Sequence, residues 1–224
     1  MLPILRVGHR GLAGHAPENT LAAIWKAWSL RIDMVEVDVR ETGDGHLILL
    51  HDDLVDRTTN KTGPVAEMSL EQVQRLNAGE WQRIPSLEEA LEVGTGKVGM
   101  ILELKVEGIG AEASSIVKRI GFTGSLMYAS FLQQELMRVR QAEPGALMMM
   151  LMDEQLPKDP LADAVALRAS HVGLHYSTVT PRLIQTCHNV GLQVFAYTVN
   201  SLEDIQKMKT LSLDGIISDF PDRI

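Results

Sequence analysis

Short apolar runs alternate with segments of helical pattern along most of this 224-residue chain, and this alternation constrains the fold more than any other feature. The runs are typical of strands, and the segments between them begin at helix-capping residues. The predicted strands cover residues 4–8, 35–39, 98–104, 126–130, 147–152, 171–175, 193–198 and 215–218, and the predicted helices cover 21–30, 86–93, 110–120, 133–141, 161–168, 181–189 and 201–209. Strands that alternate with helices favour parallel pairing with right-handed crossovers.

Eight such repeats predict an α/β fold of the (β/α)8, or TIM-barrel, type. An open doubly wound sheet is the alternative, but the glycine-rich phosphate-binding fingerprint of dinucleotide folds is missing after the first predicted strand. No linker or change in composition divides the chain, so residues 1–224 are expected to form a single domain.

Residues 43–80 interrupt the alternation after the second strand, and we interpret them as a short insertion. The turn Thr42-Gly43-Asp44-Gly45 precedes a short apolar run at 47–50, so residues 34–51 are expected to form a β-hairpin. One short helix is predicted at 69–76, with Ser69 as its cap.

The composition excludes some classes of partner. The formal net charge is −8, which argues against nucleic acid and acidic membranes because both require a basic surface. A small anionic substrate stays compatible, since a metal ion and a few cations can reverse the field inside one cleft. No apolar run approaches the roughly 18 residues of a membrane span, and no signal peptide is visible, so we expect a cytoplasmic protein without stable membrane association.

The predicted strand Val35-Glu36-Val37-Asp38-Val39 carries two carboxylates on one face, because side chains two residues apart in a strand point the same way. Two interpretations are open at this point. An edge strand with one wet face shows the same alternation. Alternatively, a divalent cation lies between Glu36 and Asp38 and offsets their mutual repulsion.

Polar residues gather where the predicted strands end, which is where the catalytic groups of parallel barrels lie. They are His9 and Arg10 after the first strand, Glu36 and Asp38 on the second, His51 after the extra strand, Glu103 and Lys105, Ser130, His175, Tyr197 and Asn200, and Asp219. Such a concentration of ionisable side chains at one end of a barrel predicts a reaction centre.

The chemistry of this set indicates phosphodiester cleavage. Three carboxylates suit a hard cation with oxygen ligands, Mg²⁺ or Ca²⁺, better than zinc. Arg10 and Lys105 add positive charge that suits a phosphate. His9 and His51 can move protons near neutral pH, one from a nucleophile and one to a leaving oxygen.

The same residues carry a resemblance to the glycerophosphodiester phosphodiesterase family. It runs through His9-Arg10-Gly11, Pro17-Glu18-Asn19-Thr20, the strand with Glu36 and Asp38, Asp44-Gly45 before His51-Asp52, Ile84-Pro85-Ser86-Leu87-Glu88-Glu89, Glu103-Leu104-Lys105, Tyr197-Thr198-Val199-Asn200 and Asp214 to Pro221. The chain departs from the family pattern at Tyr197, where the family often has Trp, and at Ser218-Asp219-Phe220-Pro221, where it often has Thr-Asp-Arg-Pro. These differences concern the pocket wall and therefore head-group selectivity.

The resemblance implies a TIM barrel with a small inserted subdomain and a divalent metal. It implies hydrolysis of small-molecule glycerophosphodiesters to sn-glycerol 3-phosphate and an alcohol, through a cyclic phosphate. Glu36, Asp38 and Glu103 then become metal ligands, His9 and His51 the acid–base pair, and Arg10 and Lys105 the phosphate contacts. Ser130, His175, Tyr197 and Asn200 are pocket candidates, while Glu18 and Asn19 are expected to brace the first loop.

Two alternatives remain. A lysophospholipase D or a phosphatidylinositol phospholipase C-like enzyme could use the same groups, although such enzymes generally need an apolar surface to meet lipid, and the short insertion shows little of one. A non-catalytic barrel that binds phosphodiesters is the other, but a binding protein has no need of two proton-transferring histidines.

Overall fold

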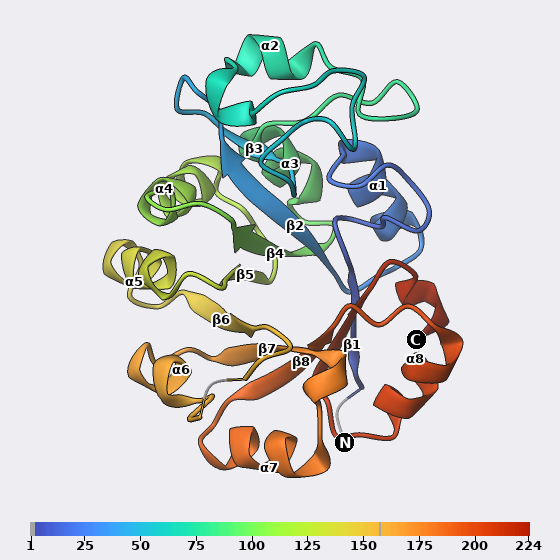
Figure 1. Ribbon diagram of the computed structural model, residues 1–224, viewed down its shortest axis with the longest axis vertical. Helices are drawn as coiled ribbons and strands as arrows, with labels where there is room; N and C mark the ends of the chain where they lie inside the picture. Colours follow the sequence, from blue (N-terminus) through green and yellow to red (C-terminus); the bar gives the residue numbers. More distant parts are fainter. Residues whose placement is uncertain (1–2, 157) are drawn as a thin grey trace.

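The computed structural model describes residues 3–156 and 158–224, in which eight parallel strands form a closed barrel (Figure 1). The strands are β1 (Leu5–Gly8), β2 (Met34–Glu41), β4 (Gly99–Leu104), β5 (Leu126–Ser130), β6 (Leu147–Met152), β7 (His171–His175), β8 (Gln193–Tyr197) and β9 (Gly215–Ser218). Each strand pairs with its neighbours, and β1 closes the barrel by pairing with both β9 and β2. The predicted TIM barrel is confirmed, and the open sheet is excluded.

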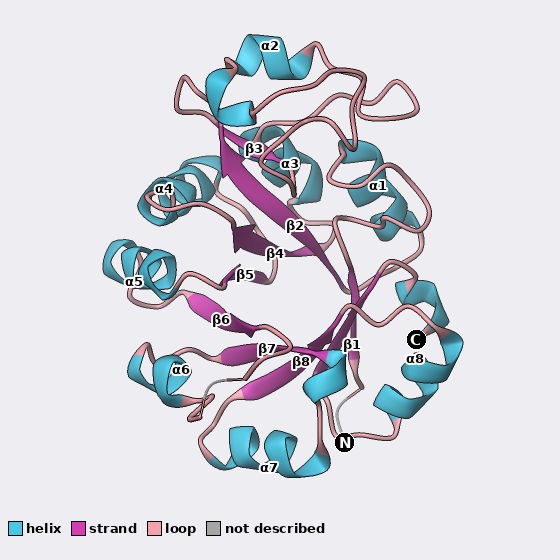
Figure 2. Ribbon diagram, viewed as in Figure 1, coloured by secondary structure: helices cyan, strands magenta, loops and turns pink. Residues whose placement is uncertain are grey.

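Helices surround the barrel on its outer side (Figure 2). They are α1 (Leu21–Ser29), α3 (Leu87–Gly94), α4 (Gly110–Ile120), α5 (Gln133–Ala142), α6 (Ala162–Ala166), α7 (Pro181–Asn189) and α8 (Leu202–Lys209), with short 3-10 turns η2 (Tyr176–Thr178) and η3 (Pro221–Arg223). Side-chain caps fix several starts: Thr20 accepts from the Ala23 amide, and Ser86 forms a reciprocal capping box with Glu89. The α6 helix is shorter than the predicted 161–168.

Successive side chains along each strand point alternately into the barrel and outward to the helices, and they form two buried layers. One set fills the barrel interior: Val7, Met34, Ile101, Met127, Ala129, Met149, Leu151, Phe195 and Ile217. The other set packs between the strands and the helices, and it includes Val35, Val37, Met148 and Met150. Because strand side chains alternate, residues 36 and 38 continue the inward row that begins with Met34, and residue 103 continues the row of Ile101. The carboxylates therefore point into the barrel.

The segment after β2 forms a small layer at one edge of the barrel (Figure 1). β3 (Leu47–Leu49) pairs antiparallel with β2, as the hairpin prediction required. The 3-10 turn η1 (Val65–Glu67) and the helix α2 (Leu70–Gln74) follow. This segment has a buried cluster of its own, made of Ile48, Leu50, Val55, Val65, Val73, Leu76, Ala78 and Ile84.

Over the described part of the chain, no helix combines the length and apolar character needed to cross a membrane.

Candidate active site

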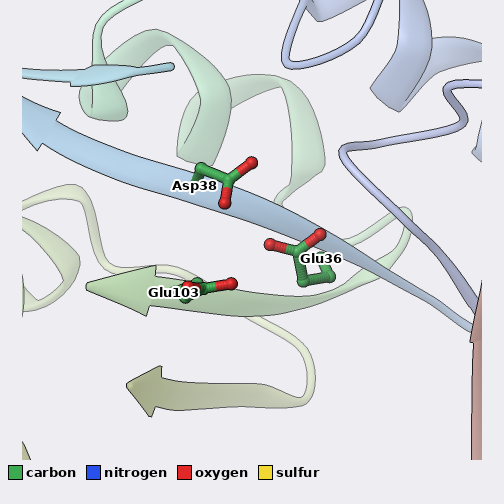
Figure 3. A group of neighbouring side chains, drawn as sticks. All are labelled: Glu36, Asp38 and Glu103. Carbon is green, nitrogen blue, oxygen red and sulfur yellow. The ribbon is translucent and has the colours of Figure 1, made fainter. Parts of the chain in front are cut away.

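Three buried carboxylates meet inside the barrel: Glu36 and Asp38 on β2, and Glu103 on β4 (Figure 3). One oxygen from each lies within 4.8 Å of the others. The parallel register places Asp38 directly beside Glu103, which brings together residues that are far apart in sequence. Glu36 and Asp38 are only 4% and 1% exposed, so the wet-edge interpretation of this strand is wrong.

The electrostatics of these carboxylates favour a bound cation. Burial, with Asp38 and Glu103 nearby, raises the pKa of Glu36 well above its ordinary value, and burial and Asp38 raise the pKa of Glu103. For Asp38, the upward effect of burial is outweighed by Lys105, His51 and Arg10, and its pKa is lowered. The triad thus concentrates more negative charge than the barrel interior readily holds.

Two oxygen atoms of the triad have no hydrogen-bond partner among the described residues: Oε1 of Glu36 and Oδ1 of Asp38, both buried. A buried carboxylate oxygen without a donor is unfavourable unless a cation compensates it. Three carboxylates are also the ligand type that Mg²⁺ and Ca²⁺ prefer. The residues present therefore fit the predicted divalent metal ion.

The loop between β1 and α1 holds the triad in place. The backbone N–H of Arg10 donates to Oε2 of Glu36 at 2.9 Å. The Asn19 side chain makes two hydrogen bonds to Asp38: its Nδ2 donates to Oδ2 at 2.8 Å, and its Oδ1 accepts from the Asp38 amide at 3.1 Å. Glu18 accepts from Nη1 of Arg10 at 2.8 Å. Glu18 and Asn19 thus brace this loop, as the sequence predicts.

The two predicted phosphate-binding cations lie beside the triad. Nζ of Lys105 is 2.7 Å from Oε1 of Glu103 and 3.4 Å from Oδ1 of Asp38. Nε of Arg10 is 3.6 Å from Oδ2 of Asp38. Burial lowers the pKa of Lys105, but Glu103 and Asp38 outweigh it and raise the pKa overall. Lys105 therefore carries full positive charge at neutral pH.

His9 follows β1, and its ring is held by a carboxylate from the far end of the chain. Nδ1 of His9 is 2.7 Å from Oδ1 of Asp219, which follows β9. Asn200 in turn donates to Oδ2 of Asp219 at 2.6 Å and accepts from its amide at 2.8 Å. With Nδ1 occupied by a carboxylate, Nε2 is the nitrogen available for proton transfer. The pairing of His9 with Asp219 is not predicted from the sequence.

His51, which follows β3, is also held by a carboxylate. Nδ1 of His51 is 2.6 Å from Oδ1 of Asp52, and the His51 carbonyl accepts from Nε of Arg40 at 2.8 Å. Burial lowers the pKa of His51, against the opposing effects of Asp38 and Asp52. With Nδ1 facing the Asp52 carboxylate, Nε2 of His51 is again the nitrogen available for proton transfer.

A small pocket of about 30 Å³, open to solvent, borders Glu36 and Glu103 of the triad. Its polar lining includes His9, Glu36 and Glu103, and the rest of its lining includes Ala129, Phe131, Met149, Leu151 and Tyr197. Phe131 and Tyr197 contact edge to face, with ring centroids 6.1 Å apart. Phe131 was not among the residues predicted from sequence; its position directly after β5 is the signal that could have found it.

Of the other predicted pocket residues, His175 contacts Tyr197, whereas Ser130 and Asn200 hold other parts of the chain in place. The His175 ring lies edge-on to Tyr197, with centroids 6.0 Å apart. Ser130 is fully buried, and its hydroxyl donates to the Leu104 carbonyl at 2.7 Å and accepts from the Leu132 amide at 2.9 Å. Ser130 thus joins the ends of β4 and β5 and is absent from the cavity wall, and Asn200 serves by holding Asp219.

Known proteins are similar to this chain over nearly its whole length. The model of the "Glycerophosphoryl diester phosphodiesterase family" matches residues 9–223. A glycerophosphodiester phosphodiesterase of Caldanaerobacter subterraneus subsp. tengcongensis is 32% identical, with 98% of this chain and 96% of that protein covered.

Solved structures agree with the sequence match. A phosphodiesterase of Oleispira antarctica in complex with the product sn-glycerol-3-phosphate superimposes with a TM-score of 0.90 at 30% identity, covering 100% of this chain and 95% of that one. A glycerophosphodiester phosphodiesterase of Agrobacterium tumefaciens str. C58 gives a TM-score of 0.86 at 30% identity, with 99% of both chains covered. With its barrel, its buried acidic triad and these relatives, the chain belongs to the glycerophosphoryl diester phosphodiesterase family.

Proposed function

We propose that this protein hydrolyses small-molecule glycerophosphodiesters to sn-glycerol 3-phosphate and an alcohol. The observation that carries the proposal is the convergence of the buried triad, two cations and two carboxylate-held histidines at one end of the barrel. The product found in the Oleispira antarctica phosphodiesterase supports the same substrate class.

Glu36, Asp38 and Glu103 would hold one divalent cation, Mg²⁺ or Ca²⁺. Such a cation, when bound, polarises a phosphoryl oxygen and offsets the charge that develops during displacement. Arg10 and Lys105 bind the phosphate from the same side and fix its orientation.

The two histidines move the protons. His9 removes the proton of the glycerol 2-hydroxyl, whose oxygen attacks phosphorus, and His51 protonates the leaving alcohol oxygen. The products of this step are a cyclic phosphate and the free alcohol. His51, now neutral, takes a proton from water as it attacks the cyclic phosphate, and protonated His9 returns its proton to the glycerol oxygen.

Replacement of either histidine tests this assignment. In His51→Ala and in His9→Ala we expect turnover to fall by about 10²–10⁴-fold without loss of fold, because one general acid or base contributes that much. The measurement is coupled detection of glycerol 3-phosphate released from glycerophosphocholine. His46→Ala, at an exposed histidine, is the control. Near-normal turnover of His51→Ala would contradict the proposed role.

Metal removal tests the triad. Excess EDTA should abolish turnover, and added Mg²⁺ or Ca²⁺ should restore it, whereas turnover that resists chelation would count against a metal site.

The same assay with lysophosphatidylcholine separates this function from a lysophospholipase D activity, and binding without turnover would favour a non-catalytic barrel. The cytoplasmic location stays a prediction.

A further inference from the structure

Arg57, which follows β3 in the inserted segment, joins two loops of the site through a single guanidinium group. Its Nε donates to Oδ2 of Asp52 at 2.7 Å, and Nη2 to Oδ1 of Asp52 at 3.2 Å. Nη1 and Nη2 also donate to Oε2 and Oε1 of Glu18, both at 2.8 Å. One planar fork thus binds two carboxylates, each through two hydrogen bonds.

Each of these carboxylates is also in contact with a group of the reaction centre. Asp52 holds Nδ1 of His51 at 2.6 Å. Glu18 accepts from Nη1 of Arg10 at 2.8 Å, and Arg10 lies beside Asp38. These contacts connect His51 to Arg10 through Asp52, Arg57 and Glu18.

The arrangement differs from an ordinary surface ion pair. Arg75 of the same segment, with a side chain 75% exposed, contacts one glutamate a helical turn away, and such pairs contribute little to stability. The carboxylates that Arg57 binds are only 28% and 20% exposed, although Arg57 itself is 47% exposed. Burial acts to raise the pKa of Glu18, but Arg57 and Arg10 outweigh it, so Glu18 is ionised and can hold both cations.

The physical consequence concerns orientation. Without the guanidinium group, Asp52 and Glu18 would be two like-charged carboxylates near one another, each able to rotate away. His51 would then lose the fixed acceptor that sets its tautomer, and Arg10 would lose its lateral support. Groups that orient reacting side chains in this way typically affect activity by about 10–100-fold.

We propose that Arg57 is a positioning residue that couples the inserted segment to the acid–base histidine and to the phosphate-binding arginine. The inference rests on the proposed function, because it takes His51 and Arg10 as participants in turnover. It assigns the inserted segment a role in aligning the site from outside the barrel.

The first test compares Arg57→Ala with Arg75→Ala, which removes an arginine from the same segment without touching the site. We expect Arg57→Ala to lower kcat/KM for glycerophosphocholine by about 10–100-fold, with Arg75→Ala unchanged and with similar thermal midpoints for both. Arg57→Lys keeps the charge but loses the planar fork, so it should recover only part of the activity. If Arg57→Ala fails to fold, Arg57→Lys compared with Arg75→Lys decides.

The second test asks whether Arg57 acts through its two carboxylates. In a Glu18→Gln, Asp52→Asn background, adding Arg57→Ala should lower kcat/KM further by less than about threefold, since coupled residues are not additive. Nitrogen NMR of the substrate-free protein gives a readout apart from activity. The His51 ring, identified by comparison with His51→Gln, should carry its proton on Nδ1 in the wild type and shift toward the other tautomer in Arg57→Ala.

The outcomes separate the two proposals. If the wild type is active and Arg57→Ala matches Arg75→Ala in both rate and His51 tautomer, the role of Arg57 is refuted while the proposed function stands. A fully additive effect in the triple variant also refutes it. If the wild type releases no glycerol 3-phosphate from any glycerophosphodiester with either metal, the proposed function fails, and the role of Arg57 fails with it.

Discussion

The aspartate side chains of this site differ in what they can bind, because their neighbours differ. Asp38 lies among cations and is available as a metal ligand, while Asp219 and Asp52 each hold the Nδ1 of a histidine. Burial raises the pKa of Asp219, but hydrogen bonds from His9 and Asn200 outweigh it and lower the pKa overall. Asp219 therefore stays ionised at neutral pH and can hold the His9 ring in one orientation.

Asp219→Asn should lower kcat by about 10–100-fold while leaving the fold intact, because the amide no longer fixes the His9 tautomer. Steady-state kinetics with glycerophosphocholine measure the effect. Asp222→Asn is a control on the same segment, since Oδ1 of Asp222 lies 2.8 Å from Nε2 of His15, a histidine apart from the candidate site. Equal kinetics for the two variants would rule out the role of Asp219.

Asn19→Gly should weaken binding of Mg²⁺ or Ca²⁺ by about 10–100-fold, because the side chain that orients Asp38 is removed. Asn19 has a φ of +56°, a conformation that glycine adopts without strain, so the substitution isolates the side chain. Isothermal titration calorimetry of the metal alone measures the loss. Asn189→Gly, at an exposed residue that ends α7, should bind metal like the wild type.

Among the elements, the β1–α1 loop packs closely against β2. Gly11 donates to the Glu36 carbonyl at 2.7 Å and has a φ of +85°. A Cβ atom at this position would lie 2.7 Å from the Cβ of Ala23 on α1. Both the backbone conformation and the lack of space therefore require glycine, and the close approach is what brings Arg10 onto Glu36.

Gly11→Ala should reduce the free energy of unfolding by more than Gly191→Ala does. Gly191 has a similar φ of +80° but nothing near its Cβ position, so its variant carries only the backbone strain of about 1–3 kcal/mol. The difference between the two variants, measured by urea denaturation, reports the contact with α1. Equal losses would show that Ala23 moves aside without cost.

The site residues that can be predicted from the sequence are those that lie on strands, where the two-residue repeat shows which side chains share a face. Glu36 and Asp38 are two apart on a strand, as are Glu103 and Lys105, and this spacing alone places each pair on one face. The pairing of His9 with Asp219 joins positions separated by 210 residues, and no local pattern encodes it. Arg57 lies in an irregular polar segment, where no period identifies the side chain that turns toward the site.

At the scale of the whole molecule, the barrel has its candidate catalytic groups at one end and an uncharged interior below them. His171 begins β7, is 5% exposed, and lies edge-on to Phe195 with ring centroids 5.4 Å apart. Burial lowers the pKa of His171, while Gln193 and Asp214 act in the opposite direction with smaller effect. The folded barrel therefore holds this imidazole neutral.

Stability should decrease as the pH falls below about 6.5, because His171 takes up a proton in the unfolded chain before it does so in the folded one. Between these two pKa values the unfolded state binds more protons, so acid favours unfolding. Denaturant titrations at several pH values across this range measure the effect. The free energy of unfolding should fall more steeply with decreasing pH in the wild type than in His171→Gln. His46→Gln, at an exposed histidine, should follow the wild-type slope.

The barrel joins its first strand to its last, and this has a consequence for synthesis of the chain. β1 pairs over four positions with β9 but over only two with β2, so the barrel stays open until β9 has emerged. Asp219, which follows β9, reaches His9 only at that moment. The β2–β4 pairing that brings Asp38 beside Glu103 needs no later part of the chain, whereas His9 cannot be held by Asp219 before β9 has been made. We therefore expect hydrolytic competence to arise only when β9 pairs with β1 and the barrel closes.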